Sequence, residues 1–140
     1  MDLDAALSFV GEHKRGVLTT QKRDGRPQLS NIAYHLDDDG VLHISVTDSR
    51  AKTANIRRDP RVSLHVARDD FYAYVVLEAD AELTPVAASP DDATVDELVA
   101  YYKGSFGEHP EWDDYRRAMV AEGRLVVRLR PQHAYGMLPS

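Results

Sequence analysis

The stretch Ser49-Arg50-Ala51-Lys52-Thr53 carries the side chains whose types and order best suit binding chemistry. It lies where a predicted strand ends and a predicted helix begins, so unpaired backbone N–H groups and the positive end of the helix point to one place. Arg50 presents a planar fork suited to phosphate oxygens, and Lys52 adds a compact point charge. With the hydroxyl groups of the stretch, these cations suit a dianionic phosphomonoester. A short basic helix with a solvated face fits the spacing about equally well.

Small polar side chains on two predicted strands form a second candidate feature. Gln28 and Ser30 share one face of their strand, because side chains alternate along a strand. Ser45 and Thr47 share one face of the next strand in the same way. Exposure to solvent is the simpler interpretation of each pair. Together, beside an anion site, the two pairs begin to resemble the wall of a pocket.

Aromatic residues cluster at Phe71, Tyr72 and Tyr74, and such rings could stack on a planar ligand. The pattern alone favours a role in the core or in a dimer contact. His35, His43 and His65 have no partners at metal-ligand spacing, and the acidic residues 37–39 end in a glycine typical of a turn. The sequence therefore predicts no metal site.

The composition narrows the class of protein. The chain has 140 residues, which suits one domain, and it contains no cysteine, so disulfides and thiolate chemistry are excluded. Its net charge of −6 argues against a general nucleic-acid binder. No apolar run is long enough to span a membrane, and the acidic, amphipathic N-terminal residues do not resemble a signal peptide. We therefore expect a cytoplasmic protein.

The elements that must position these residues follow from hydrophobic periodicity and turn signals. We expect a domain over residues 1–140 that is mainly β with inserted helices (α+β), built on a six-stranded antiparallel barrel, with a helical insert at about 86–123. Ser89 and Pro90 are typical of the start of the first helix of that insert. The predicted strands are 15–20, 28–36, 41–47, 62–67, 72–83 and 124–130, and the other predicted helices are 3–10, a short one from Ser49 to Pro60, and 111–122.

Two segments then resemble a known family. GRPQLSN and SRAKTANIRRDPRVSL are similar to the deazaflavin-dependent branch of the pyridoxamine 5′-phosphate oxidase-like superfamily, which has the FMN-binding split β-barrel fold. SPDDATVDELVAYYKGSFGEHPEWDDYRRAM resembles the helical insert of that branch, and HAYG resembles its tail. The resemblance implies a homodimer with two sites for coenzyme F420, a deazaflavin with a phosphate and a polyglutamate tail, at the subunit interface.

The resemblance also implies which residues contact the coenzyme. The phosphate would lie against Arg50, Lys52 and Thr53. The second strand would contribute Gln28, Ser30 and Asn31, and the third strand would contribute Ser45, Val46 and Thr47. Tyr72 and Tyr74 would approach from the partner subunit, which reverses the interpretation from pattern alone.

The activity implied is hydride transfer between the deazaflavin and a small conjugated or quinone-like acceptor. The protein would supply binding, orientation and electrostatics, so we predict no catalytic residue. Two alternatives stay open: an FMN-binding oxidoreductase of the same fold, and a carrier that binds F420 without turnover. The tail RLRPQHAYGMLPS lacks the substrate-binding motif of the pyridoxamine phosphate oxidases proper, which disfavours vitamin B6 oxidation.

Overall fold

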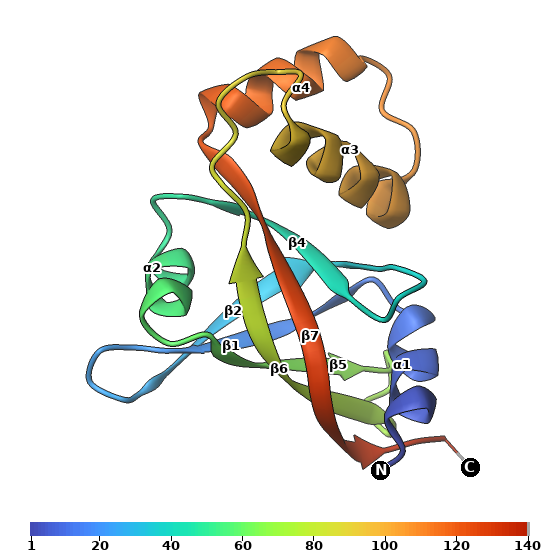
Figure 1. Cartoon of the computed structure of the whole chain (residues 1–140). Coiled ribbons are helices and arrows are strands. Elements are labelled where there is room, and N and C mark those ends of the chain that lie inside the picture. The colour runs from blue at the N-terminus through green and yellow to red at the C-terminus, as the bar shows by residue number, and fades with distance from the viewer. Residues whose placement is uncertain (140) are drawn as a thin grey trace.

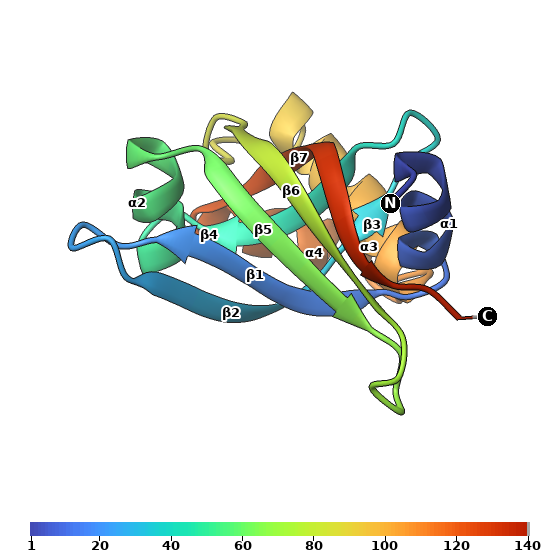
Figure 2. The same cartoon turned by 90° about the horizontal axis from the view of Figure 1, so that it is seen from below.

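The computed structural model describes residues 1–139, and its centre is a seven-stranded antiparallel sheet that curls into a half-barrel (Figures 1 and 2). The order of strands across the sheet is β2-β1-β5-β6-β7-β4-β3. Neighbouring strands in sequence are mostly neighbours in space, as expected for hairpin connections. The strands are β1 (Arg15–Gln21), β2 (Pro27–Ala33), β3 (His35–Leu36), β4 (Leu42–Thr47), β5 (Arg61–Ala67), β6 (Tyr74–Leu83) and β7 (Arg124–Met137).

Helices lie at both ends and on the outside of the sheet. Helices α1 (Leu3–Gly11) and α2 (Ala51–Arg58) lie at opposite ends of the half-barrel (Figures 1 and 2). Helices α3 (Ala93–Phe106) and α4 (Trp112–Ala121) connect β6 to β7 and pack together beside the start of β7 (Figure 1). Within residues 1–139, no helix is both long and apolar enough to cross a bilayer.

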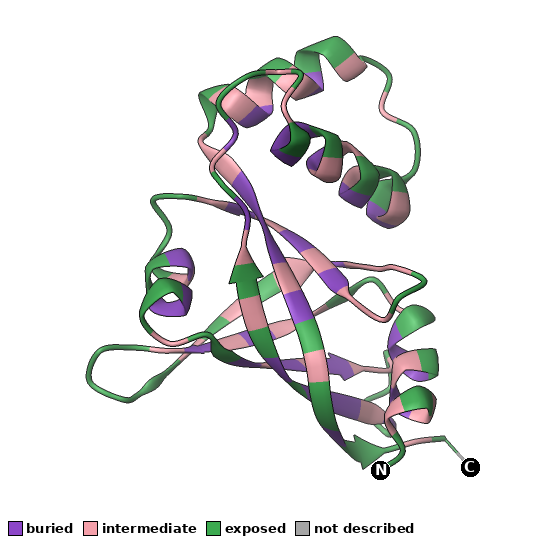
Figure 3. Cartoon of the chain, viewed as in Figure 1, coloured by how far each residue is buried: buried purple, intermediate pink, exposed green. Residues whose placement is uncertain are grey.

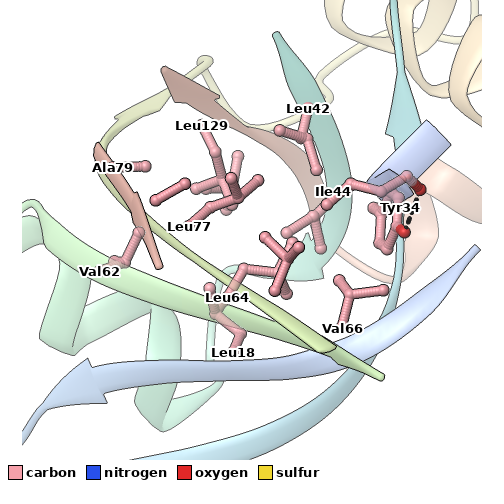
Figure 4. Close-up of a cluster of buried hydrophobic side chains, with 14 of the residues drawn as sticks. Leu18, Tyr34, Leu42, Ile44, Val62, Leu64, Val66, Leu77, Ala79 and Leu129 are labelled. Carbon is pink, nitrogen blue, oxygen red and sulfur yellow. Dashed lines mark hydrogen bonds between the residues drawn. The ribbon is translucent and has the colours of Figure 1, made fainter. Parts of the chain in front are cut away.

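The strands bury one face, as their alternating sequence predicts. Along β4, Leu42, Ile44 and Val46 are buried, while the intervening side chains are only partly covered. Alternating residues of β5 are buried in the same way, and Figure 3 shows this banding along the curled strands. The inward side chains fill the half-barrel with an apolar core (Figure 4). The predicted fold class, mainly β with inserted helices in a split-barrel arrangement, is confirmed.

The predicted count of six strands is wrong, because the expected second strand is interrupted at Tyr34. The Tyr34 ring turns into the core, where its side chain is 1% exposed, and its hydroxyl donates to the Val10 carbonyl at 2.6 Å (Figure 4). The Tyr34 backbone N–H donates to Lys14 O at 3.0 Å. Both bonds hold this residue against the α1–β1 connection and divide the expected strand into β2 and β3. The buried bond to α1 therefore outweighs the local strand pattern.

The last strand is longer than predicted, because it continues through Pro131 to Met137. A proline removes one ladder hydrogen bond and would ordinarily end a central strand. Here the register between β6 and β7 shifts between Glu78 and Ala79, opposite this proline, so a bulge accommodates it. The tail therefore pairs with β6 and carries Tyr135 on the outer face.

The start of α3 also differs from the prediction, because Asp92 rather than Ser89 caps the helix. The Asp92 carboxylate accepts from Val95 N at 2.8 Å and also from Ala88 N at 2.8 Å. It thus satisfies free N–H groups on both sides of itself, which a serine hydroxyl at 89 cannot do. The helix consequently begins at Ala93, and Pro90 lies in the preceding turn.

Candidate functional site

The turn between β4 and α2 is fastened by hydrogen bonds to the carbonyl of Thr47. Arg50 N donates to Thr47 O at 3.1 Å, and the Thr53 hydroxyl donates to the same oxygen at 2.8 Å. Thr53 is fully buried, so the proton of its hydroxyl is committed inside the protein. Its position suits the fastening of α2 to β4 rather than direct donation to a phosphate.

Two cations of this turn stand without acidic partners. Neither Arg50 nor Lys52 forms a salt bridge within residues 1–139, whereas Arg57 pairs with Asp48 at 2.6 Å. Arg58 is also occupied, because it donates to the Gln21 carbonyl at 2.7 Å. Arg50 and Lys52 are therefore available to a ligand, whereas Arg57 and Arg58 are engaged in contacts within the protein.

Lys52 is the more sheltered of the two cations. Burial lowers the pKa of its ammonium group, and the positive charges of Arg50 and Arg124 lower it further. An anion bound beside Lys52 would remove that electrostatic cost. The local electrostatics therefore favour a negatively charged ligand.

Arg124, at the start of β7, joins these cations, although the sequence pattern did not identify it. It lies opposite Thr47 in the β4–β7 register, and its Nη1 donates to Ser45 Oγ at 3.4 Å. Its proximity follows from long-range strand pairing, for which the sequence of β7 carries no local signal. We refer to Arg50, Lys52 and Arg124 as the cationic cluster.

The predicted residues of β4 divide between the two faces of the strand. Ser45 and Thr47 point away from the core and are partly covered, beside Arg124. Val46 is 1% exposed and belongs to the core. Its side chain therefore cannot line a site on the other face, and only its backbone is available there.

The predicted residues of β2 also divide. Gln28 and Ser30 pair with the core-facing residues Thr20 and Leu18 of β1, so they lie on the inner face of the sheet near α2. The Gln28 side-chain carbonyl accepts from Asn55 Nδ2 at 2.8 Å, which ties it to α2. The following Asn31 is exposed on the opposite face.

Asn31 borders a groove on the outer face of the sheet. This groove has a volume of about 700 Å³ and is lined mainly by ends of β1, β2 and β5 together with two aromatic side chains, Phe71 and Phe106. Both phenylalanine rings are exposed. The groove is thus an apolar hollow with Asn31, Arg15 and His65 as polar edges.

The two tyrosines predicted to contact the coenzyme lie at the tip of the β5–β6 hairpin and at the start of β6. Tyr72 is 79% exposed near the tip, and Tyr74 begins β6, with its ring 5.5 Å from the ring of His65. The hairpin and α2 lie at opposite ends of β5 (Figure 2). Within a single subunit, these tyrosines therefore lie away from the cationic cluster.

The neighbouring Phe71 is a backbone outlier at the same tip. Its φ is 67°, a left-handed conformation that is unfavourable for a bulky residue, and its side chain is 78% exposed. The Arg68–Asp70 ion pair at 2.9 Å and the Tyr72 N–H bond to Asp70 at 3.0 Å brace the tip. The hairpin thus presents two aromatic rings outward on a fixed backbone.

Comparison with known proteins gives one family and a group of similar structures. The family model described as pyridoxamine 5′-phosphate oxidase matches residues 3–138. A solved F420 reductase is 27% identical with a TM-score of 0.61, over 87% of this chain and 89% of that one. A conserved hypothetical protein from Mycobacterium tuberculosis is 24% identical with a TM-score of 0.76, over 100% and 90%. A haem storage protein from Vibrio cholerae is 17% identical with a TM-score of 0.69, over 98% and 96%.

Proposed function

Because the chain belongs to the pyridoxamine 5′-phosphate oxidase family, we propose that it is a coenzyme F420-dependent reductase of small conjugated or quinone-like acceptors. The observation that carries this proposal is the pair Arg50 and Lys52, which stand without salt-bridge partners in the described chain at the β4–α2 turn. A phosphate-bearing coenzyme supplies the missing negative charge. The similarity to the F420 reductase supports the choice of the deazaflavin, since it is the comparison above 25% identity among those described.

The residues present fit a flavin-type phosphate. Arg50 would bind two phosphate oxygens with its planar fork, and Lys52 would contribute a point charge. Ser45 and Thr47 offer hydroxyl groups on the outward face of β4. Gln28, held by Asn55, would present its remaining amide N–H groups to the coenzyme. The chemistry supplied by the bound coenzyme is hydride transfer at its deazaflavin ring, and the side chains bind and orient it.

The same proposal includes a homodimer. Tyr72 and Tyr74 lie at the far end of β5 from α2, so they would reach a coenzyme only if it is bound by a second copy. The outer face also exposes Leu29, Tyr135 and Met137, which a partner subunit would cover. An obligate interface of this kind buries roughly 2,000 Å² or more. Light scattering at micromolar concentration should give twice the chain mass of 15.7 kDa, and a monomer that binds coenzyme normally contradicts this part.

FMN is the second candidate coenzyme, because the chain belongs to a family that is named after pyridoxamine 5′-phosphate oxidase and not after an F420 enzyme. The same cations would bind the FMN phosphate. A carrier that holds F420 without turnover uses the same residues. The haem storage protein, at 17% identity, supports the fold alone and adds no haem assignment here.

Titration separates these alternatives. We expect F420 to bind more tightly than FMN when fluorescence is followed during addition of each coenzyme to the purified chain. We then expect reduced F420 to be oxidised by members of a panel of quinones and enones. Submicromolar FMN binding without F420 binding transfers the assignment to the FMN enzyme. Tight F420 binding without turnover of any acceptor indicates the carrier.

A further inference from the structure

The start of β7 is joined to the β4–α2 turn by the backbone. Arg124 pairs directly with Thr47, and one residue further Asp48 N donates to Gly123 O at 2.9 Å. Gly123 has a φ of +65°, the left-handed conformation that lets the chain turn from α4 into β7. The segment that carries Arg124 is therefore held beside the segment that carries Arg50 and Lys52.

The Arg124 guanidinium has one occupied edge and one edge directed toward β4. Its Nε and Nη2 both donate to Glu122 Oε1 at 3.1 Å. Its Nη1 faces Ser45 Oγ at 3.4 Å, a long contact that a stronger acceptor could replace. Glu122 thus orients the group without occupying the edge that faces the outward hydroxyl groups of β4.

The charges around this point do not balance. The cationic cluster holds three positive groups, and Glu122 is the carboxylate that pairs with one of them. This excess of positive charge occurs on a chain whose net charge is −6. Burial is the main cause of the lowered pKa of Lys52, and the positive charges of Arg50 and Arg124 lower that pKa further. A bound anion with more than one negative charge would balance the cluster.

We propose that Arg124 is a third anion-binding residue of this site, that its Nη1 edge contacts the coenzyme phosphate, and that Glu122 is its positioning residue. The assignment of the anion as a coenzyme phosphate rests on the proposed function. The assignment of Arg124 to an anion site rests on the strand register and on the contacts with Ser45 and Glu122. Because Glu122 ends α4, the helical pair then sets the position of one phosphate-binding group.

The test compares ligands that differ only in their phosphate-bearing part. One pair is FMN and riboflavin, and the other is F420 and its deazariboflavin core, which lacks the phosphate and the tail. Arg124→Gln should weaken binding of the phosphorylated member by about tenfold, the loss expected for one charge-assisted hydrogen bond. Binding of the unphosphorylated member should stay unchanged. Glu122→Gln should weaken binding of the phosphorylated member by a smaller factor, because Arg124 keeps its charge but loses the carboxylate that orients it.

Arg130→Gln is the matched control, since Arg130 is an exposed arginine on the same strand that pairs with Glu82 at 3.5 Å. It should change neither affinity. A second measurement needs no coenzyme: the Lys52 ammonium is titrated by NMR in wild type and in Arg124→Gln. Removal of the neighbouring positive charge should raise the pKa of Lys52. Urea unfolding shows that each variant is folded, and Arg124→Lys replaces Arg124→Gln if the glutamine variant is not.

The outcomes separate this inference from the proposed function. Equal losses for phosphorylated and unphosphorylated ligands, or no loss for either, overturn the role of Arg124. If wild type binds neither coenzyme, inorganic phosphate is titrated by NMR instead. Phosphate binding that Arg124→Gln weakens and Arg130→Gln does not would retain the anion site while the proposed coenzyme function fails. Absence of phosphate binding in wild type as well overturns both.

Discussion

Two groups of charged side chains lie along the outward face of β4 and β7, and they differ in how their charges are matched. Beside α3, Arg128 donates to Glu97 at 2.9 and 2.6 Å and to Glu82 at 2.5 Å. His43 faces Asp37 at 2.7 Å and Glu97 at 3.1 Å. We refer to these five residues as the matched cluster. At the other end of the same strands, the cationic cluster holds three positive groups and a salt bridge from Arg124 to Glu122.

The difference indicates two uses of charge on one surface. In the matched cluster, each carboxylate lies within hydrogen-bond distance of Arg128 or His43, and these contacts fasten α3 to the sheet without a ligand. In the cationic cluster, the partners available within the described chain do not balance the charge. Such an imbalance is typical of a binding site, because its cost is recovered only when the ligand is present. Mutations should therefore affect folding at one end and binding at the other.

The largest expected effect concerns Glu97, which both Arg128 and His43 contact. Glu97→Ala should lower the free energy of unfolding by about 2–3 kcal/mol, because the partly buried Arg128 loses two of its three hydrogen bonds to carboxylates and His43 loses one partner. Coenzyme affinity should change less than twofold. Urea denaturation and coenzyme titration on the same preparation check both expectations. A tenfold loss of affinity with unchanged stability would reverse the roles assigned to the two clusters.

The cationic cluster should give the opposite pattern. Lys52→Ala should weaken coenzyme binding by about tenfold to a hundredfold, or about 1.5–3 kcal/mol, because a charged hydrogen bond to phosphate is lost. Stability of the free protein should hardly change, since the removed cation has no acidic partner in the described chain. Arg50→Lys should also weaken binding, because a point charge cannot replace the bidentate fork. Calorimetric titration beside wild type measures these changes, and equal dissociation constants would remove the phosphate from this site.

Local patterns in the sequence predicted much of the fold. Alternation alone identified the buried faces of β4 and β5, since the period of two is a property of the strand itself. The position of Arg50 and Lys52 at a strand-to-helix junction was likewise readable from neighbouring residues. Each of these features depends on contacts within a few residues along the chain.

Features that depend on distant segments were not predicted. The break at Tyr34 requires the carbonyl of Val10, and the placement of Arg124 requires the pairing of β7 with β4. The helix cap at Asp92 rather than Ser89 is a local exception, because two residues of suitable type compete there and only the Asp92 carboxylate bonds to N–H groups on both sides. The proposed roles of Tyr72 and Tyr74 depend on a second chain and stay predictions.

Acid should weaken the matched cluster, because two of its carboxylates have a lowered pKa in the folded protein. Burial opposes ionisation of Glu97, but hydrogen bonds from Arg128 and His43 outweigh it and lower its pKa below the ordinary 4.5. The pKa of Asp37 is lowered below 3.8 against the effect of burial, mainly by the His43 hydrogen bond and backbone N–H groups. A lowered pKa in the folded state contributes stability above the unfolded value, and this stability is lost as the pH falls through the folded value.

The measurement is urea unfolding of wild type and Glu97→Gln between pH 3 and 7. Wild type should lose stability as the pH falls below about 4.5, with a slope of at most about 1.4 kcal/mol per pH unit for each proton taken up. Glu97→Gln should start less stable at pH 7 and decline more gently. Parallel curves for the two proteins would show that Glu97 does not contribute to the acid sensitivity.

The smallest effect is expected for Gln28. This residue should affect both folding and binding, because it is a predicted coenzyme contact and also accepts a hydrogen bond from the buried Asn55. Gln28→Ala should cost about 1 kcal/mol of unfolding free energy, the net value of one hydrogen bond, and weaken coenzyme binding a few-fold. Asn31→Ala is the comparison on the same strand, since Asn31 is exposed on the opposite face. Asn31→Ala should leave the free energy of unfolding unchanged, and it should weaken coenzyme binding only if the outer face takes part in the site.

Thermal unfolding and coenzyme titration of both variants measure these changes. Loss of affinity in neither variant would confine the coenzyme contacts to β4 and α2, whereas loss in both would extend the site around the edge of the sheet.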